Sequence, residues 1–243
     1  MKLRFGYVSR NLTMRLIETI KHSRFSAVLL VALLYGCASS SREEEQTVTP
    51  ASSPLAGMIG RQVVVLPAQL LSTSGPAGTW DVRPDEAPLL KLLDEEIADA
   101  FRKRGVRSNW TFAAELIASA TRNAGLAGNP LALPVAGIRR IKASDTPLPE
   151  PLASNIRTLV SLTNARYVIM PLETKVDIKA ERRKGALNLL LIDSRTARVL
   201  WAGEVEGQTS TDPATVSETM SPYGFRILAR ELAGLFADMA VAQ

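Results

Sequence analysis

Apolar residues recur along the chain with the spacings of helices and of strands. Four segments have the four-residue spacing of an amphipathic helix: 84–105, 112–120, 152–160 and 222–239. In the first segment, Leu89, Leu93, Ile97 and Phe101 form the apolar stripe, and Gly105 is a suitable residue to end the helix. The last segment opens on Ser221 and Pro222, which are typical of a helix start.

Runs of β-branched and other apolar residues predict five strands: 61–68, 106–110, 166–178, 187–192 and 198–207. The last two are joined by five residues, Asp193 to Ala197, which predicts a hairpin. We expect a polar loop after the first strand, up to about residue 83. A second, longer loop is expected over 126–151, because its five prolines remove backbone donors.

The order of these elements predicts the fold class. It is strand, helix, strand, helix, helix, three strands in succession and a final helix. Such a chain forms an α/β (α+β) fold, with a single mixed β-sheet and helices packed on it.

Residues 25–36 form an apolar segment of twelve residues that follows basic residues. This length suits a signal peptide, whereas a membrane-spanning helix needs about twenty apolar residues. Leu34, Tyr35, Gly36 and Cys37 resemble the lipobox of bacterial lipoproteins, in which signal peptidase II recognises the first three residues and the cysteine becomes lipidated. The resemblance implies a diacylglycerol group and an N-acyl chain on Cys37, and no other cofactor is expected.

The lipobox divides the chain into three parts. Residues 1–36 are the expected lipoprotein signal peptide, 37–57 the lipidated cysteine and a flexible tether, and 58–243 a periplasmic α/β domain. Ala38 and Ser39 follow the cysteine, where lipoproteins retained in the inner membrane usually carry aspartate. We therefore expect an anchor in the outer membrane, on its periplasmic face. Translation could start at Met1 or Met14.

Charge and residue inventory exclude several function classes. Six of the 29 cations and one of the 24 acids precede Cys37, which leaves 23 of each in the remainder. A neutral remainder does not predict nucleic-acid binding. The only histidine, His22, and the only cysteine, Cys37, leave the domain without the residues of a Cys/His site, a Ser/His/Asp triad or a zinc site. We expect no metal and no enzymatic activity.

Three segments together resemble a family: VVVLPAQ at 63–69, NARYVIMPLE at 164–173 and LNLLLIDSRTARVLWAGEVEG at 187–207. They are similar to the periplasmic domain shared by LpoB-type penicillin-binding-protein activator lipoproteins, CsgG-like secretion lipoproteins and the N-terminal domain of TolB. The resemblance implies a protein that acts by binding. Ala197 stands where that family prefers glycine, which predicts a different turn geometry.

Acidic residues offer two candidate sites. Glu204 and Glu206 are two apart on a predicted strand and therefore project from one face, which is one arrangement for the acid pair of a glycosidase. The alternative, which we favour, is a solvated strand face. Asp94, Glu95 and Glu96 spread around a helix and are interpreted as solubilising.

Basic clusters and tryptophans are candidates for contact with a partner. The clusters could meet anionic lipid headgroups, peptidoglycan carboxylates or an acidic protein, although solvated loops are the simpler interpretation. Trp201 is assigned to the core and Trp80 to an exposed loop. The candidate residues are Trp80, Trp110, Arg139, Arg140, Lys142, Arg182, Arg183 and Lys184.

Three functions remain open from the sequence. The first is a non-enzymatic accessory or regulator of a cell-envelope protein, of which a peptidoglycan synthase activator of the LpoB type is one form. The second is a subunit of an oligomeric CsgG-like secretion or assembly complex of the outer membrane. The third, which we rank last, is an envelope hydrolase that uses carboxylates such as Glu204. The identity of the partner and the oligomeric state are not determined by the sequence.

Overall fold

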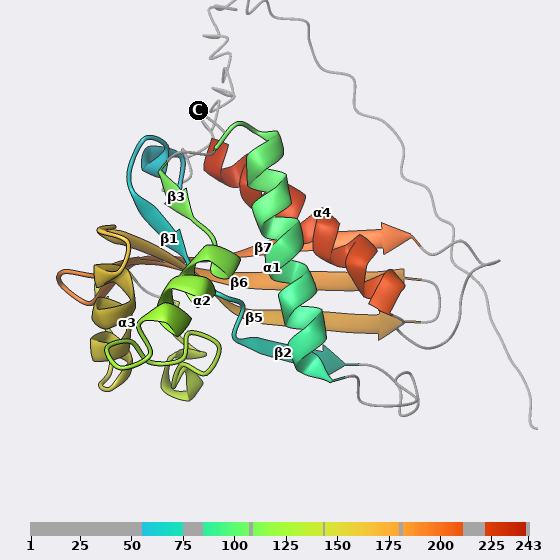
Figure 1. Cartoon of the computed structure of the whole chain (residues 1–243). Coiled ribbons are helices and arrows are strands. Elements are labelled where there is room, and N and C mark those ends of the chain that lie inside the picture. The colour runs from blue at the N-terminus through green and yellow to red at the C-terminus, as the bar shows by residue number, and fades with distance from the viewer. Residues whose placement is uncertain are drawn as a thin grey trace, which may run out of the picture. The chain divides into compact units, whose positions relative to one another are not determined.

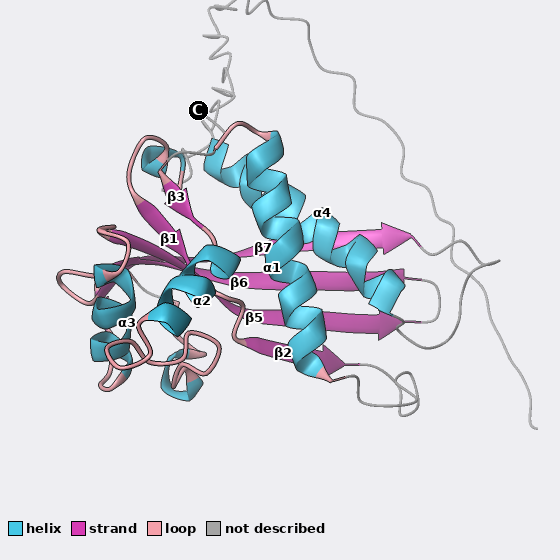
Figure 2. Ribbon diagram, in the orientation of Figure 1, coloured by secondary structure: helices cyan, strands magenta, loops and turns pink. Residues whose placement is uncertain are grey.

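Three long strands form the middle of the sheet in the computed structural model of the chain. The structure describes residues 55–74, 85–106, 109–142, 144–179, 182–210 and 222–241. In these residues one mixed seven-stranded sheet carries four α-helices, which confirms the predicted fold class (Figures 1 and 2). Residues 1–54, with the lipobox and Cys37, and Trp80 lie outside the described residues.

The three central strands are β5 (Tyr167–Lys179), β6 (Arg182–Asp193) and β7 (Arg198–Ser210), which run antiparallel in succession. This confirms the predicted hairpin, and β6 is longer than the apolar run that predicted it. Ala197, in the turn, has a φ of 51°. That is the left-handed conformation that glycine adopts without strain.

Two short strands lie end to end along the other edge of β5. The valines of β1 (Val63–Val65) pair in parallel with its first residues, and β2 (Leu70–Ser74) pairs in parallel with its second part. The order across the sheet is β3, β1, β5, β6, β7 and β4, with β2 beside β5. The expected loop after residue 68 is therefore wrong over β2.

The two outermost strands contain two residues each. In β3 (Trp110–Thr111), pairing is parallel with β1, and in β4 (Thr146–Pro147) it is antiparallel with β7. Of the expected strand over 106–110, residue 110 lies in β3, whereas the described residues 106 and 109 lie outside any strand.

Helices α1 (Glu86–Lys103) and α4 (Pro222–Val241) pack side by side on one face of the sheet (Figure 1). The Asp85 side chain caps α1 by accepting from the Ala87 N–H at 3.3 Å, and Gly105 follows its end with a φ of 83°. The apolar stripes predicted for both helices enter one core. Its largest fully buried side chains include Phe101, Phe225, Phe236, Leu93 and Ile97.

A second core lies on the opposite face of the sheet. It is covered by α2 (Ala113–Arg122), α3 (Leu152–Ser161) and the proline-rich loop, which contains the short 3-10 helix η2 (Ala136–Ile138). The predicted left-handed end after α3 is confirmed at Asn164, where φ is 56°. Among the described residues, this cover packs on β1, on the first residues of β5 and β7 and on the last residues of β6.

The fold begins earlier than the sequence indicates. Leu55, which the sequence analysis places near the end of the tether, is fully buried in the first core. The 3-10 helix η1 (Ala56–Met58) follows it and contacts α4.

Candidate binding surface

Residues 173–179 of β5, 182–188 of β6 and 204–210 of β7, together with β2, form a sheet extension, and among the described helices only α1 and α4 pack on it, on one face. We call the other face of this extension the open face. Alternate residues of each strand belong to the open face, and the register aligns them in rows that cross the sheet. The rows are Ser74–Asp177–Lys184–Gln208, Ser72–Lys175–Ala186–Glu206 and Leu70–Glu173–Asn188–Glu204.

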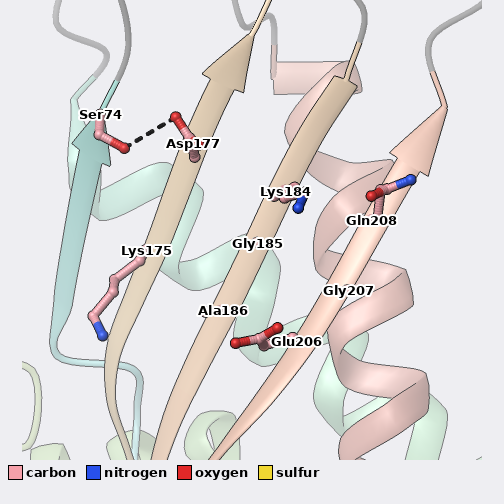
Figure 3. Close-up of a pocket in the computed structure, with 9 residues that line it drawn as sticks. All are labelled: Ser74, Lys175, Asp177, Lys184, Gly185, Ala186, Glu206, Gly207 and Gln208. Atoms are coloured by element: carbon pink, nitrogen blue, oxygen red, sulfur yellow. Dashed lines mark hydrogen bonds between the residues drawn. The ribbon is translucent and has the colours of Figure 1, made fainter. Parts of the chain in front are cut away.

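A depression of about 490 Å³ lies on the first two rows. Ala186 lies in its middle, and Lys184, Glu206 and Gln208 line it from β6 and β7 (Figure 3). On its other side Ser74 donates to Asp177, with 3.3 Å between the oxygens. Because the residues on this face have short or polar side chains, the surface suits a macromolecule that lies across the strands better than it suits an enclosed small ligand.

An ion pair joins the second row to the third. Lys175 Nζ lies 3.0 Å from Glu204 Oε2. Asn188 lies between them, and its amide, oriented to satisfy both neighbours, accepts from Lys175 Nζ at 3.2 Å and donates to Glu204. The partners of Glu204 therefore lie on β5 and β6, on the side of β7 away from its outer edge.

Arg139, from the proline-rich loop, reaches over the edge of the open face to Glu173. Its guanidinium pairs with the Glu173 carboxylate and donates to Ser72 Oγ at 3.1 Å, while Ser72 Oγ donates to Glu173 at 2.5 Å. Burial raises the pKa of Glu173, but the hydrogen bonds from Ser72 and Arg139 outweigh it and bring that pKa below its usual value. The pair holds the loop against β2 and β5.

The structure separates the predicted basic residues. In the first cluster Arg139 is held in its ion pair, whereas Arg140 and Lys142 are exposed. Lys142 lines a second depression of about 360 Å³, together with Lys175 and Glu204. Arg139 is exposed as well, which agrees with the interpretation of this cluster as a solvated loop, and its ion pair is an additional contact.

In the second cluster, Arg183 is buried and only 8% exposed, which contradicts its assignment to a partner-binding surface. Lys184 is exposed and lies on the open face. The side chain of Arg182 lies outside the described residues.

Glu204 and Glu206 project from the same face of β7, as predicted. Glu206 lines the first depression and Glu204 the second, so the two carboxylates do not share a cavity. This arrangement favours the interpretation as a solvated strand face.

The tryptophans lie apart from the open face where the structure describes them. Trp110 is 4% exposed and packs against Phe101, with 4.8 Å between ring centroids, so it is a core residue rather than an interface anchor. Trp201 is partly buried against the first core, and its ring lies where a Cβ at Gly203 would be. Gly203 thus makes room for this indole.

Two acids on α1 have roles that the sequence analysis missed. Asp94 Oδ1 accepts the Ala68 N–H at 2.9 Å, and burial raises the pKa of Asp94 to about 7, against the effect of that hydrogen bond. Glu96 is 7% exposed and pairs with Arg226 and Arg230 of α4, at 3.3 and 3.1 Å. The interpretation as solubilising is wrong for Asp94 and Glu96, whose partners lie on distant segments, whereas Glu95 is exposed.

Among the described residues, no group of three or more His, Cys, Asp or Glu side chains is placed to hold a metal ion. Within the same ranges, no helix combines the length and the apolar character that crossing a bilayer requires.

No protein-family model matches the chain, and no curated protein matches it in sequence. Solved structures to which it is similar include the LpoB C-terminal domain from Salmonella enterica, at 14% identity and a TM-score of 0.33, covering 65% of this chain and 96% of that one. The PelC dodecamer from Paraburkholderia phytofirmans is similar at 12% identity and a TM-score of 0.33, covering 75% and 89%. Lipoprotein GNA1162 from Neisseria meningitidis follows at 15% identity and a TM-score of 0.28, covering 61% and 81%. At these identities and TM-scores, no functional property of these proteins carries over to the chain.

Proposed function

We propose that the chain is a lipoprotein of the outer membrane, anchored at its periplasmic face through Cys37, and that it acts as a non-enzymatic accessory to another protein of the cell envelope. The lipobox sequence from Leu34 to Cys37, after its apolar segment, carries the proposal. Several acyl chains on one cysteine give a stable anchor, because each buried methylene contributes about 0.8 kcal/mol.

The open face supports the second half of the proposal. A sheet covered by helices on one side needs only one apolar face to be stable, so its other face is available for recognition. On the open face, the polar rows and the depression around Ala186 offer contacts from three strands at once. The inventory of the domain, without histidine or a second cysteine, favours binding over catalysis.

The finer form of the proposal is an activator of a peptidoglycan synthase. It is supported by the resemblance of segments 63–69, 164–173 and 187–207 to the LpoB group. An activator of this kind binds its synthase and raises the rate of polymerisation without taking part in the chemistry.

The anchor is tested by expressing the full chain in a Gram-negative host with radiolabelled palmitate. We expect label in the wild type and in a Ser39→Ala control, and none in Cys37→Ala, which should also remain unprocessed. Equal labelling or identical fractionation of the Cys37→Ala chain would remove the proposed anchor.

The accessory role is tested with two variants that add the same side chain at different places. Ala186→Arg fills the middle of the first depression, whereas Ala114→Arg adds an arginine to the exposed side of α2. Purified full chain in detergent is added to a bifunctional peptidoglycan synthase of the same envelope, and polymerisation of lipid-linked precursor is measured. We expect stimulation by the wild type and by Ala114→Arg, and its loss with Ala186→Arg. Equal stimulation by both variants would exclude the open face, and no stimulation by the wild type would exclude synthase activation.

A further inference from the structure

Strand β7 has one paired edge and a second edge with which, over most of its length, none of the described strands pairs; we call this second edge the free edge. Its inner edge pairs with β6 from Arg198 to Ser210. On the outer edge, β4 pairs with Arg198 and Val199 only, and the Asp145 N–H donates to the Val199 carbonyl at 2.6 Å. From residue 200 to 210, no described strand pairs with this edge (Figure 1). A long row of unpaired backbone donors and acceptors is a template for a further strand.

Carboxylates lie on both sides of this free edge. Glu204 and Glu206 project on the open face. On the opposite face, Glu231 of α4 lies over β7, since its Cγ is 3.0 Å from the position that a Cβ on Gly207 would take. Glu206 and Glu231 are exposed, and neither has an ion-pair partner among the residues that the structure describes. The free edge is therefore acidic on both faces.

The negative charge of the free edge indicates which kind of segment can pair with it. Two copies of the chain that joined their β7 edges in antiparallel fashion would bring Glu204 and Glu206 of one copy against those of the other, and like charges opposite each other destabilise a strand pair. The expected tether is unsuitable as well, because it carries three consecutive glutamates, Glu43, Glu44 and Glu45, and two prolines. A segment with cations at alternate positions would pair with the acids and complete the backbone hydrogen bonds.

We propose that the free edge of β7 binds an extended, basic segment of the partner protein as an additional strand. Lysine or arginine at alternate positions of that segment faces Glu204 and Glu206, and the main chain supplies the remaining contacts. The inference rests on the proposed accessory role and gives the partner a recognisable chemistry.

The first test uses a ten-residue peptide of alternating lysine and threonine, capped at both ends, and a matched peptide of alternating glutamate and threonine. Both are titrated calorimetrically into the purified full chain in detergent. We expect the lysine peptide to bind at least about tenfold more tightly than the glutamate peptide, because opposite charges are complementary across the edge. No binding of the lysine peptide would overturn the inference.

Two double variants distinguish binding of the lysine peptide at the free edge from its general attraction to acidic residues elsewhere on the protein. Glu206→Gln with Glu231→Gln removes the unpaired carboxylates at the edge, and we expect about fivefold weaker binding of the lysine peptide. Glu86→Gln with Glu95→Gln removes the same charge from α1, and affinity should stay within about twofold. Equal losses in the two variants would overturn the inference.

Backbone pairing is tested with two lysine–threonine peptides that are N-methylated at every second residue, one on the lysines and one on the threonines. An added strand uses the amide groups of one of its own edges only, so one peptide should keep its affinity and the other should lose at least about tenfold. Equal affinities of the two methylated peptides would show attraction without strand addition and would overturn the inference. These measurements do not depend on lipidation or on synthase activation, so their failure leaves the accessory role to its own experiments.

Discussion

The two faces of the β5–β6–β7 extension are built from alternate residues of the same strands, yet one is a core and the other a polar surface. On the helix face, Val176, Leu187 and Val205 are buried beneath α1 and α4. Their neighbours Lys175 and Lys184 are exposed on the open face. Strand periodicity creates both faces, but the helices decide which face has to be apolar. The open face is therefore free to serve recognition without a cost in stability.

The largest effect should come from matched truncations on the two faces of β6. Leu187→Ala removes a fully buried side chain and should lower the free energy of unfolding by about 2–5 kcal/mol. Lys184→Ala, three residues away on the open face, should change it by less than about 0.5 kcal/mol. Urea unfolding of both variants measures the difference. Similar losses would mean that the open face is covered in the folded protein.

A smaller effect is expected where the proline-rich loop meets the open face. Arg139→Ala leaves the Glu173 carboxylate without its cation and should lower the free energy of unfolding by about 1–3 kcal/mol. Arg140→Ala, at the next residue, should change it by no more than about 0.5 kcal/mol.

The pH dependence of this pair follows from the lowered pKa of Glu173. A carboxyl group whose pKa is lower in the folded state stabilises the fold above its unfolded pKa, and that contribution is lost as the pH falls through the folded value. The difference between wild type and Arg139→Ala should therefore narrow below about pH 4. A difference that stays constant in acid would contradict the assignment of the pair.

Asp94, on α1, provides a test on the helix face of the sheet, because its pKa is raised to about 7 in the folded state. A raised pKa means that this group favours the fold below the unfolded pKa and that the contribution is lost as the pH rises through about 7. Asp94→Asn should accordingly be closest in stability to the wild type near pH 4 and be more stable by at least about 1–2 kcal/mol near pH 8. Unfolding at the two pH values measures this, with Asp177→Asn on the open face as the control. An Asp94→Asn curve parallel to that of the wild type would refute the raised pKa.

The smallest effect is expected at Ala197, in the β6–β7 turn. Ala197 has a positive φ of 51°, which costs an L-residue more than glycine. Ala197→Gly should raise the midpoint of thermal unfolding, with a gain of about 0.5–1 kcal/mol after the larger entropy of glycine in the unfolded chain is included. A lower midpoint would show that the contacts of the buried methyl group outweigh its strain.

Elements with a strong local pattern could be predicted from the sequence. The stripe from Leu89 to Phe101 predicted α1, and the apolar runs predicted the three central strands. The strand β2 could not be predicted, since Ser72, Thr73 and Ser74 have no apolar alternation and become a strand only by pairing with β5.

The candidate surface was predicted only in part. The common face of Glu204 and Glu206 follows from strand periodicity alone. The ion pair of Arg139 with Glu173 and the burial of Arg183 do not, because each depends on which distant segment packs against the residue.

By itself the sequence determined the mixed sheet, the apolar faces of its helices, the neutral charge of the region after Cys37 and the lipobox on which the proposed anchor depends. Each of these follows from residue type and local spacing. Tertiary structure alone decided that α2 and α3 cover only part of the second face, that Asp94 accepts from Ala68 and Glu96 pairs with arginines of α4, and that no described strand pairs with the outer edge of β7 beyond residue 199. The physical reason is that burial and strand pairing depend on which distant segment packs against a residue. The residues next to it in the sequence do not determine which segment that is.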